Sequence, residues 1–415
     1  MGPVDLSPPE DDARAAVEAA VRASYGRLLA LLATWCGDLA LAEDALADAV
    51  ERALRTWPEA GVPANPEGWL HRVARRRALD VLRSSARRTS RPLDDDAAVG
   101  SEADPAEADP DALPDRRLEL LLVCAHPAID PAVRAPLMLQ TVLGLDAARI
   151  ATAFAVPNAT MAQRLVRAKR RIRDARIPFR VPGRDELDRR LPAVLEAVYG
   201  AYTIEWARTS GPTVRESLAV EARELALVLS GLLDDAEALG LAALLCLSSA
   251  RLGARVTGGV HVPLDEQDTR RWDAGLVEQG EALLRRAHGH GDPGRFQLEA
   301  ALQSAHCARA RTGRTDRVAV LRLHRALARV APTLGAEVAL AAATAHVEGP
   351  RAGLDLLGPL ADRCRAFQPY WATRGDLLAR AGEAAQARTA WARAVDLTTD
   401  PPSRRYLEGR LASLG

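Results

Sequence analysis

A block of positive charge followed at once by a block of negative charge divides the first third of this chain. Residues 69–91 hold eight arginines and one acid, whereas residues 93–115 hold nine acids and no base. The acidic region is punctuated by proline and poor in large apolar residues, so it cannot bury enough surface to fold. We therefore expect a flexible acidic linker over residues 87–114, with a separately folded domain on each side.

The rest of the chain favours helices. Its 415 residues suffice for two or three domains, and 48% of them are hydrophobic while only 4% are aromatic. We predict an all-α fold, because apolar residues recur at steps of three and four, as on one face of a helix. A clear example is the series Leu39, Ala42, Leu46, Val50 and Ala53.

Prolines and composition place the boundaries. The helix through Leu46 is expected to end at Trp57-Pro58, since proline cannot continue it, and the next to run from Pro66 or Trp69 to Arg83. The run "IPFRVPG" marks a later break. The predicted organisation is a helical domain over 11–86, the linker over 87–114, a helical domain over 115–180 and a longer helical region over 186–415.

The C-terminal region carries a pattern typical of tetratricopeptide repeats. In such a repeat, small residues let two antiparallel helices approach, and large residues fill the gaps between them. Counting from Trp371, the chain places matching residues at Gly375, Leu378, Gly382, Ala387, Trp391 and Ala394. We expect an α-solenoid-like fold for the C-terminal half.

Several protein classes are disfavoured. No stretch of eighteen apolar residues predicts a membrane span, and the acidic, proline-bearing N-terminus is unlike a signal peptide. Five scattered cysteines without a CxxC pair fit reduced thiols in the cytoplasm. No GxSxG, Walker A or HExxH motif occurs, and the acidic run "LDEQD" at 264–268 is more simply a helix cap than a cation site. We predict no catalytic residue, cofactor or metal.

Residues 158–173 form the most basic helical stretch, with five arginines and the one lysine of the chain, Lys169. A short helix over 147–154 and a three-residue turn at 155–157 precede it, so the pair forms a helix-turn-helix. The apolar stripe of the second helix is Met161, Leu165, Ala168 and Ile172. Its other side would contact base edges first and phosphates further along, through Thr160, Gln163, Arg164, Arg167, Arg170 and Arg171, with Lys169 off that face. The alternative is a solvated basic surface.

A second basic helix, "WLHRVARRRALDVLR", begins at Trp69. Arginines beside an aromatic side chain suit single-stranded or melted DNA; the alternatives are a core tryptophan and arginines that only maintain solubility. The inward side is expected to hold Leu70, Val73, Ala74 and Val81, and the outward side Trp69, Arg72, Arg76 and Arg83, with Arg75 nearby.

Taken in order, these runs resemble the bacterial extracytoplasmic-function (ECF) sigma factors over residues 12–180. The run "LAEDALADAVERAL" resembles region 2.2, which docks on the β′ clamp helices of core RNA polymerase. "NPEGWLHRVARRRALDVLR" resembles regions 2.3–2.4, which melt and bind the −10 element, and the helix-turn-helix resembles region 4.2, which binds the −35 element. The resemblance implies a cytoplasmic, non-enzymatic factor that recruits polymerase, through its clamp helices and β flap, to promoter DNA.

The resemblance also assigns residues. Asp44, Asp48 and Arg52 would face polymerase, and Asn65 would lie where the family captures a flipped −10 base. The −10 strand would contact Trp69, Arg72, Arg75, Arg76 and Arg83, and the −35 groove Thr160, Gln163, Arg164, Arg167, Arg170 and Arg171.

The C-terminal half resembles the tetratricopeptide-like extension of one ECF subgroup, on runs such as "VPANPEGWL", "HPAI" and "LDEQDTRRWD". The chain departs from that subgroup at 198–206, where "VYGAYTIEW" replaces a "YLIFNEGY"-like run. The extension would modulate activity. Two other functions remain open: a helix-turn-helix regulator that does not engage polymerase, and a peptide-binding scaffold built on the solenoid.

Overall fold

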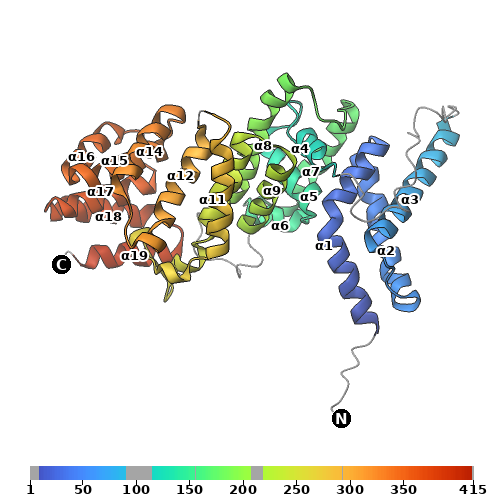
Figure 1. The fold of residues 1–415 in the computed structure, drawn as a ribbon, viewed down its shortest axis with the longest axis horizontal. Helices are drawn as coiled ribbons and strands as arrows, with labels where there is room; N and C mark the ends of the chain where they lie inside the picture. The colour runs from blue at the N-terminus through green and yellow to red at the C-terminus, as the bar shows by residue number, and fades with distance from the viewer. Residues whose placement is uncertain (1–8, 90–114, 155, 207–217, 292, 414–415) are drawn as a thin grey trace, which may run out of the picture. The chain divides into compact units, whose positions relative to one another are not determined.

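The computed structural model describes residues 9–89, 115–154, 156–206, 218–291 and 293–413 (Figure 1). The described chain is helical apart from one short hairpin, which confirms the all-α class. It divides into two compact units, 1–200 and 201–415, and the division falls inside one helix, Arg184–Trp206. Of the predicted linker, residues 90–114 lie outside the described residues.

The first unit contains two groups of helices. The first three helices contact one another: α1 (Pro9–Cys36), α2 (Leu39–Ala60) and α3 (Pro66–Thr89). The following helices are α4 (Arg117–Cys124), α5 (Pro131–Leu143), α6 (Ala147–Ala153), α7 (Asn158–Asp174) and the start of α8 (Arg184–Trp206). Within this second group α5 contacts α4, α6 and α7.

Three local predictions in the first group were wrong. Helix α3 does not end at Arg83 but continues to Thr89, so residues 87–89 are helical and not linker. Helix α2 continues through Pro58 to Ala60 and ends at Gly61, whose φ is 84° and whose N–H bonds to the carbonyl of Trp57. Proline is tolerated there because only the last turn follows it, so little of the helix depends on its missing N–H. In α3 the predicted inward Val81 is 37% exposed, since the buried stripe runs through Leu70, Ala74 and Ala78 at four-residue steps.

The helix-turn-helix is formed as predicted. Helix α6 ends at Ala153 and α7 begins at Asn158, and the two helices pack together. All four residues of the predicted apolar stripe of α7 are buried, namely Met161, Leu165, Ala168 and Ile172.

The second unit is a succession of helices in which most pack on the next one. They are α9 (Leu218–Leu232), α10 (Ala236–Ser249), α11 (Ala274–His288), α12 (Arg295–Cys307), α13 (Arg309–Thr312), α14 (Arg317–Val330), α15 (Leu334–Glu348), α16 (Pro350–Leu357), α17 (Gln368–Arg380), α18 (Ala384–Leu397) and α19 (Pro401–Ala412). Short 3₁₀ turns lie at Leu252–Ala254, Leu264–Glu266, Thr269–Arg271 and Gly358–Leu360. This arrangement is the expected α-solenoid-like one.

Helix α10 does not follow the amphipathic pattern of most helices in this unit. All twelve residues from Ala238 to Ser249 are buried, and the helix contacts α9, α11 and α12. The stretch Ala236–Ala254 is the one part of the described chain long and apolar enough to cross a membrane, but 78% of it is buried inside the protein. A helix that is apolar all round is expected where neighbours surround it, so α10 is the central helix of the unit.

A small hairpin was not predicted. Strands β1 (Val256–Thr257) and β2 (Val260–His261) pair antiparallel, with Val256 opposite His261. Gly258 and Gly259 form the turn, with φ of 56° and 76°. Two adjacent positive φ angles require such residues, so the dipeptide Gly-Gly was the available signal.

The tetratricopeptide pattern corresponds to α17 and α18. Gly375 lies so close to Trp391 that a Cβ on it would be 2.3 Å from Cδ1 of the ring. Trp391 is 2% exposed and packs with Leu378, Ala387 and Ala394. The small residue therefore allows the two helices to approach, as the repeat requires.

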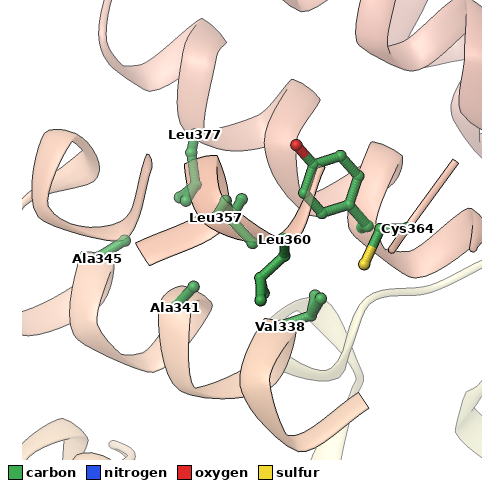
Figure 2. Packing of buried hydrophobic residues seen from close by; sticks show 8 residues of the cluster. Val338, Ala341, Ala345, Leu357, Leu360, Cys364 and Leu377 are labelled. Carbon is green, nitrogen blue, oxygen red and sulfur yellow. The ribbon is translucent and has the colours of Figure 1, made fainter. Parts of the chain in front are cut away.

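A neighbouring apolar cluster joins α15, α16 and α17. Figure 2 shows side chains from these helices converging, with the Cys364 thiol at one edge. The core members of the cluster are Val338, Ala341, Ala345, Leu357, Leu360, Cys364, Tyr370 and Leu377. Successive repeats thus share one continuous core.

We predict that Gly375→Ala lowers the free energy of unfolding of the extension by about 1–3 kcal/mol, because the methyl group would overpack the Trp391 contact. Gly409→Ala is the control, since Gly409 is exposed in α19 and a methyl group added there would have nothing within 4 Å. That change should instead raise the free energy by up to about 1 kcal/mol through helix propensity. Denaturant unfolding followed by circular dichroism measures both, and equal effects of the two changes would contradict the close approach.

Candidate nucleic-acid interface

The outward face of α7 is basic and accessible. Gln163, Arg167, Arg170 and Arg171 are exposed, whereas Thr160 and Arg164 near the start of the helix are half-buried. Because the apolar stripe on the opposite side is fully buried, the helix is held in one orientation and these side chains project together.

Lys169 lies on a different side of α7 and is largely buried. Its Nζ is 2.5 Å from a carboxylate oxygen of Glu43 in α2, and the two side chains are 12% and 18% exposed. Burial raises the pKa of Glu43 above its usual range and Asp44 adds to this, although Lys169 acts in the opposite direction. Lys169 therefore lies away from the exposed basic side of α7, and it has a partner that no sequence pattern indicated.

Helix α3 begins with a side-chain cap. The Oδ1 of Asn65 accepts the backbone N–H of Gly68 at 2.7 Å, and Pro66 occupies the first helical position. A Cβ on Gly68 would lie 2.7 Å from the Asn65 amide nitrogen, so a larger residue would disturb this cap. The predicted base-capturing residue thus also starts the basic helix.

Glu67 ties the same turn to α1. Its carboxylate accepts hydrogen bonds from two nitrogens of Arg27, the Nε contact being 2.7 Å. The Arg27 and Glu67 side chains are only 25% and 14% exposed. A paired, partly buried contact of this kind fixes the start of α3 more firmly than a surface ion pair would.

The predicted −10 residues divide into supported and exposed side chains. Trp69 is half-buried and packs edge-to-face on Trp57, with ring centroids 5.5 Å apart. The Arg75 guanidinium lies over the Trp35 ring, 5.4 Å from its centroid. The remaining three arginines are exposed: Arg72, Arg76 and Arg83.

The predicted polymerase-facing residues lie on one exposed side of α2. Asp44, Asp48 and Arg52 follow one another at four-residue steps and are all exposed. Asp48 also accepts a 2.5 Å hydrogen bond from Arg77 of α3, so it links the two helices of this surface.

Cysteine and histidine lie close together in sequence at two places, Cys124 with His126 and His306 with Cys307, and both have structural surroundings. Burial raises the pKa of the Cys124 thiol to about 12, so it is not a thiolate at neutral pH. His126 accepts the backbone N–H of Ala128 in a turn. Burial, followed by the charge of Arg251, lowers the pKa of His306 to about 4. These groups are placed for packing rather than for nucleophilic chemistry.

The acidic run at 264–268 also has local partners. Asp268 accepts the backbone N–H of Arg270, and Asp265 forms a 2.6 Å ion pair with Arg317. Among the described residues, no group of three or more His, Cys, Asp or Glu side chains is arranged to hold a metal ion.

Comparisons with known proteins place parts of the chain in known families. Residues 20–88 match Sigma-70 region 2, and residues 190–288 match a family of unknown function (DUF6596). An uncharacterized protein of Rhizobium meliloti (strain 1021), R00370, is 34% identical over 409 residues, which is 96% of each chain.

A second relative has a functional name. The probable ECF RNA polymerase sigma factor SigI of Mycobacterium tuberculosis, in strains CDC 1551 and H37Rv, is 34% identical over 167 residues. That match covers 39% of this chain and 56% of the relative. No solved structure matches the chain.

The region 2 match coincides with the bundle that carries the basic helix α3, and the SigI relative supports the same assignment. The full-length relative shares the C-terminal extension, and residues 190–288 of that extension match the family of unknown function. The chain therefore belongs to the extracytoplasmic-function sigma factors of the sigma-70 family, in a subgroup with a long C-terminal tetratricopeptide-like extension, and its role is in transcription initiation.

Proposed function

We propose that this chain directs core RNA polymerase to particular promoters by using three helices of its first unit for three tasks. Helix α7 binds the −35 element, α3 binds the −10 strand and α2 docks on polymerase. The observation that carries this proposal is the pair of basic helices, each held by a buried apolar stripe and each presenting arginines to solvent. Polymerase supplies the chemistry, since sigma factors are not enzymes.

For the −35 element, the start of α7 enters the major groove. Thr160, Gln163 and Arg164 contact base edges there, and Arg167, Arg170 and Arg171 contact phosphates further along. Gln163 is exposed, and so are the three proposed phosphate-binding residues Arg167, Arg170 and Arg171, which supports this assignment.

For the −10 element, the strand follows the exposed side of α3. Arg72, Arg76 and Arg83 contact its phosphates, and Asn65 holds a flipped base at the start of the helix. Trp69 and Arg75 act mainly by support: their packing on Trp57 and Trp35 favours a fixed surface over free stacking groups.

Polymerase docks on the exposed side of α2 through Asp44, Asp48 and Arg52, against the β′ clamp helices, while the second DNA-binding domain contacts the β flap. The proposed domains are those expected from the sequence: 11–86, 115–180 and the extension from 186. The extension modulates activity. Its presence in the full-length Rhizobium meliloti relative supports a role tied to the sigma domains.

We predict that the double variant Arg164→Glu/Arg167→Glu loses promoter-specific transcription by about tenfold or more, because it reverses charge at the −35 groove. Its affinity for core polymerase should stay unchanged. Asp44→Arg should do the reverse, weakening core binding by about tenfold. In vitro transcription measures the activity of each variant, and a core-binding assay measures its affinity for core polymerase. Loss of both activities in either variant would contradict the division, and a tight duplex-DNA footprint without core enzyme would favour the simple regulator.

We predict that Asn65→Ser and Asn65→Ala both impair promoter opening, because each removes the amide that would hold the flipped base. Only Asn65→Ala should lower the free energy of unfolding, by about 1 kcal/mol, since serine still caps the helix. Permanganate footprinting of the −10 region and thermal unfolding separate the two effects. If Asn65→Ser opened the promoter normally, Asn65 would have no role in holding a base and would act only as the cap of α3.

We predict that a chain ending at Trp206, which keeps α8 whole, differs from the full chain by several-fold in promoter-specific transcription. An increase would identify the extension as an inhibitor, and a decrease would make it a required part of the factor. Core binding of the shortened chain controls for folding of the sigma domains. Equal activity would contradict a modulating role, and recovery of peptides without polymerase subunits in a pull-down would favour the scaffold.

A further inference from the structure

A hollow in the second unit brings together the acidic turn after the hairpin and the last helices of the chain. Its volume is about 590 Å³, within the usual range for small-molecule sites. Strand β2 contacts α19, and α17 contacts both α15 and α18, so these elements lie together (Figure 1). Residues far apart in sequence therefore share this space, and no task proposed for the sigma domains uses it.

The buried part of the lining is apolar and aromatic. Trp391, Leu377 and Leu407 line the hollow and are at most 3% exposed. Tyr406 is half-buried beside them, and its ring packs edge-to-face on His261, with ring centroids 5.9 Å apart. The Tyr406 hydroxyl makes no hydrogen bond within the described chain. The hollow therefore offers a polar group as well as an apolar surface.

Two arginines of the lining share one carboxylate. Asp376 of α17 lies 3.5 Å from Arg380 and 3.2 Å from Arg410. Arg380 also donates to the carbonyl of Ala345 at 3.0 Å, and Arg410 lies over the Trp391 ring, 4.9 Å from its centroid. A guanidinium has five donors, and one carboxylate does not neutralise two guanidiniums. The two arginines are therefore held in place and keep donors for a second carboxylate.

The turn after β2 brings an unpaired carboxylate to the same hollow. Asp265 and Glu266 both line it, and Asp265 forms the ion pair with Arg317 described above. Glu266 is exposed and has no ion-pair partner within the described chain. Arg309 holds the backbone of this turn by donating to the carbonyl of Leu264 at 2.9 Å, but it does not line the hollow. The Glu266 carboxylate is therefore available to a cationic group.

The arginines and Glu266 approach the same hydroxyl. Burial raises the pKa of Tyr406, and the charges of Arg410 and Glu266 shift that pKa in opposite directions. No ion pair joins Arg410 to Glu266 within the described chain, since the carboxylate partner of Arg410 is Asp376. Groups of opposite charge thus face one space without neutralising each other.

The two histidines of the lining add no charge at neutral pH. Burial lowers the pKa of His261, and the charge of Arg255 lowers it further. Burial also lowers the pKa of His346, followed by the charges of Arg317 and Arg380. Since both imidazoles are then neutral, the guanidiniums and carboxylates alone set the charge of the hollow. The Nδ1 of His261 is buried without a hydrogen-bond partner.

We propose that this hollow binds a small zwitterion, either a free amino acid or a short peptide with both ends uncapped. Its carboxylate contacts Arg380 and Arg410, and its ammonium contacts Glu266. Its apolar part lies against Trp391 and Tyr406. A ligand of one charge sign would leave one of the two groups unmatched, so the zwitterion is favoured over a simple anion or cation. The site belongs to the extension and does not depend on the tasks proposed for α2, α3 and α7.

Isothermal titration calorimetry on the full-length chain tests the class of ligand. The probes are alanine, leucine and tyrosine, their di- and tripeptides, and the same compounds with an acetylated amine or an amidated carboxylate. We expect at least one uncapped probe to bind and either cap to weaken that binding by about tenfold or more, because each cap removes one charge. Binding of the amino acids or of the peptides supports the site and identifies the source.

Two results of this titration would overturn the proposal. The first is that no uncapped probe binds. The second is that binding tolerates either cap, which would indicate a surface for internal peptide segments and favour the scaffold. Polymerase and promoter are absent from the assay, so neither result bears on the function proposed for the sigma domains.

Charge-removing variants locate the site. Glu266→Gln removes the contact with the ammonium and Arg380→Gln removes a contact with the carboxylate, and each should weaken binding of the uncapped probe by about tenfold. Glu408→Gln and Arg329→Gln are the matched controls, because both residues are exposed and neither lines the hollow. Thermal unfolding without ligand shows whether each variant is folded. Unchanged affinity in a folded Glu266→Gln or Arg380→Gln variant, or an equal loss in its matched control, would refute the assignment.

Discussion

Repulsion between neighbouring arginines is the constraint that the two basic helices of this protein must overcome in order to stay folded. In α3, Arg72 and Arg76 are four residues apart, and in α7 the same spacing joins Arg167 and Arg171. Like charges at this spacing destabilise a helix, and in proteins most of the stability of a helix comes from packing its apolar face. Both helices are therefore stable only because their apolar stripes are buried, and that burial also fixes which side chains project outward.

This dependence explains what the sequence could predict. The stripe of α7 was predicted residue by residue because it needs only local periodicity. The stripe of α3 was predicted less well: Val81 is exposed, since neighbouring helices cover the four-residue series through Ala74 and Ala78 instead. The end of α2 was missed by one turn because proline disturbs a helix least at its end. Sequence periodicity therefore predicts where the helices lie. Packing against other helices decides where each helix ends and which of its sides is buried.

The candidate site shows the same limit more strongly. Its residue types and spacing followed from sequence, but the supports did not: Glu67 on Arg27 and Asp48 on Arg77 join residues 40 and 29 positions apart. Such pairs leave no local pattern, because each partner alone is an ordinary surface charge. Asn65 is instructive, since the short run before the basic helix also had the form of a helix start, with a capping residue followed by proline.

Lys169 shows how packing restricts the choice of side chain on α7. It is the one lysine in a chain that otherwise uses arginine, and its ion pair with Glu43 is largely buried. A compact ammonium has three donors, whereas a guanidinium has five and would need more acceptors in the same space. An arginine there would require either more water or a looser fit between α2 and α7. The close contact of α7 with α2 therefore favours lysine at position 169, where the smaller cation reaches Glu43 without further acceptors.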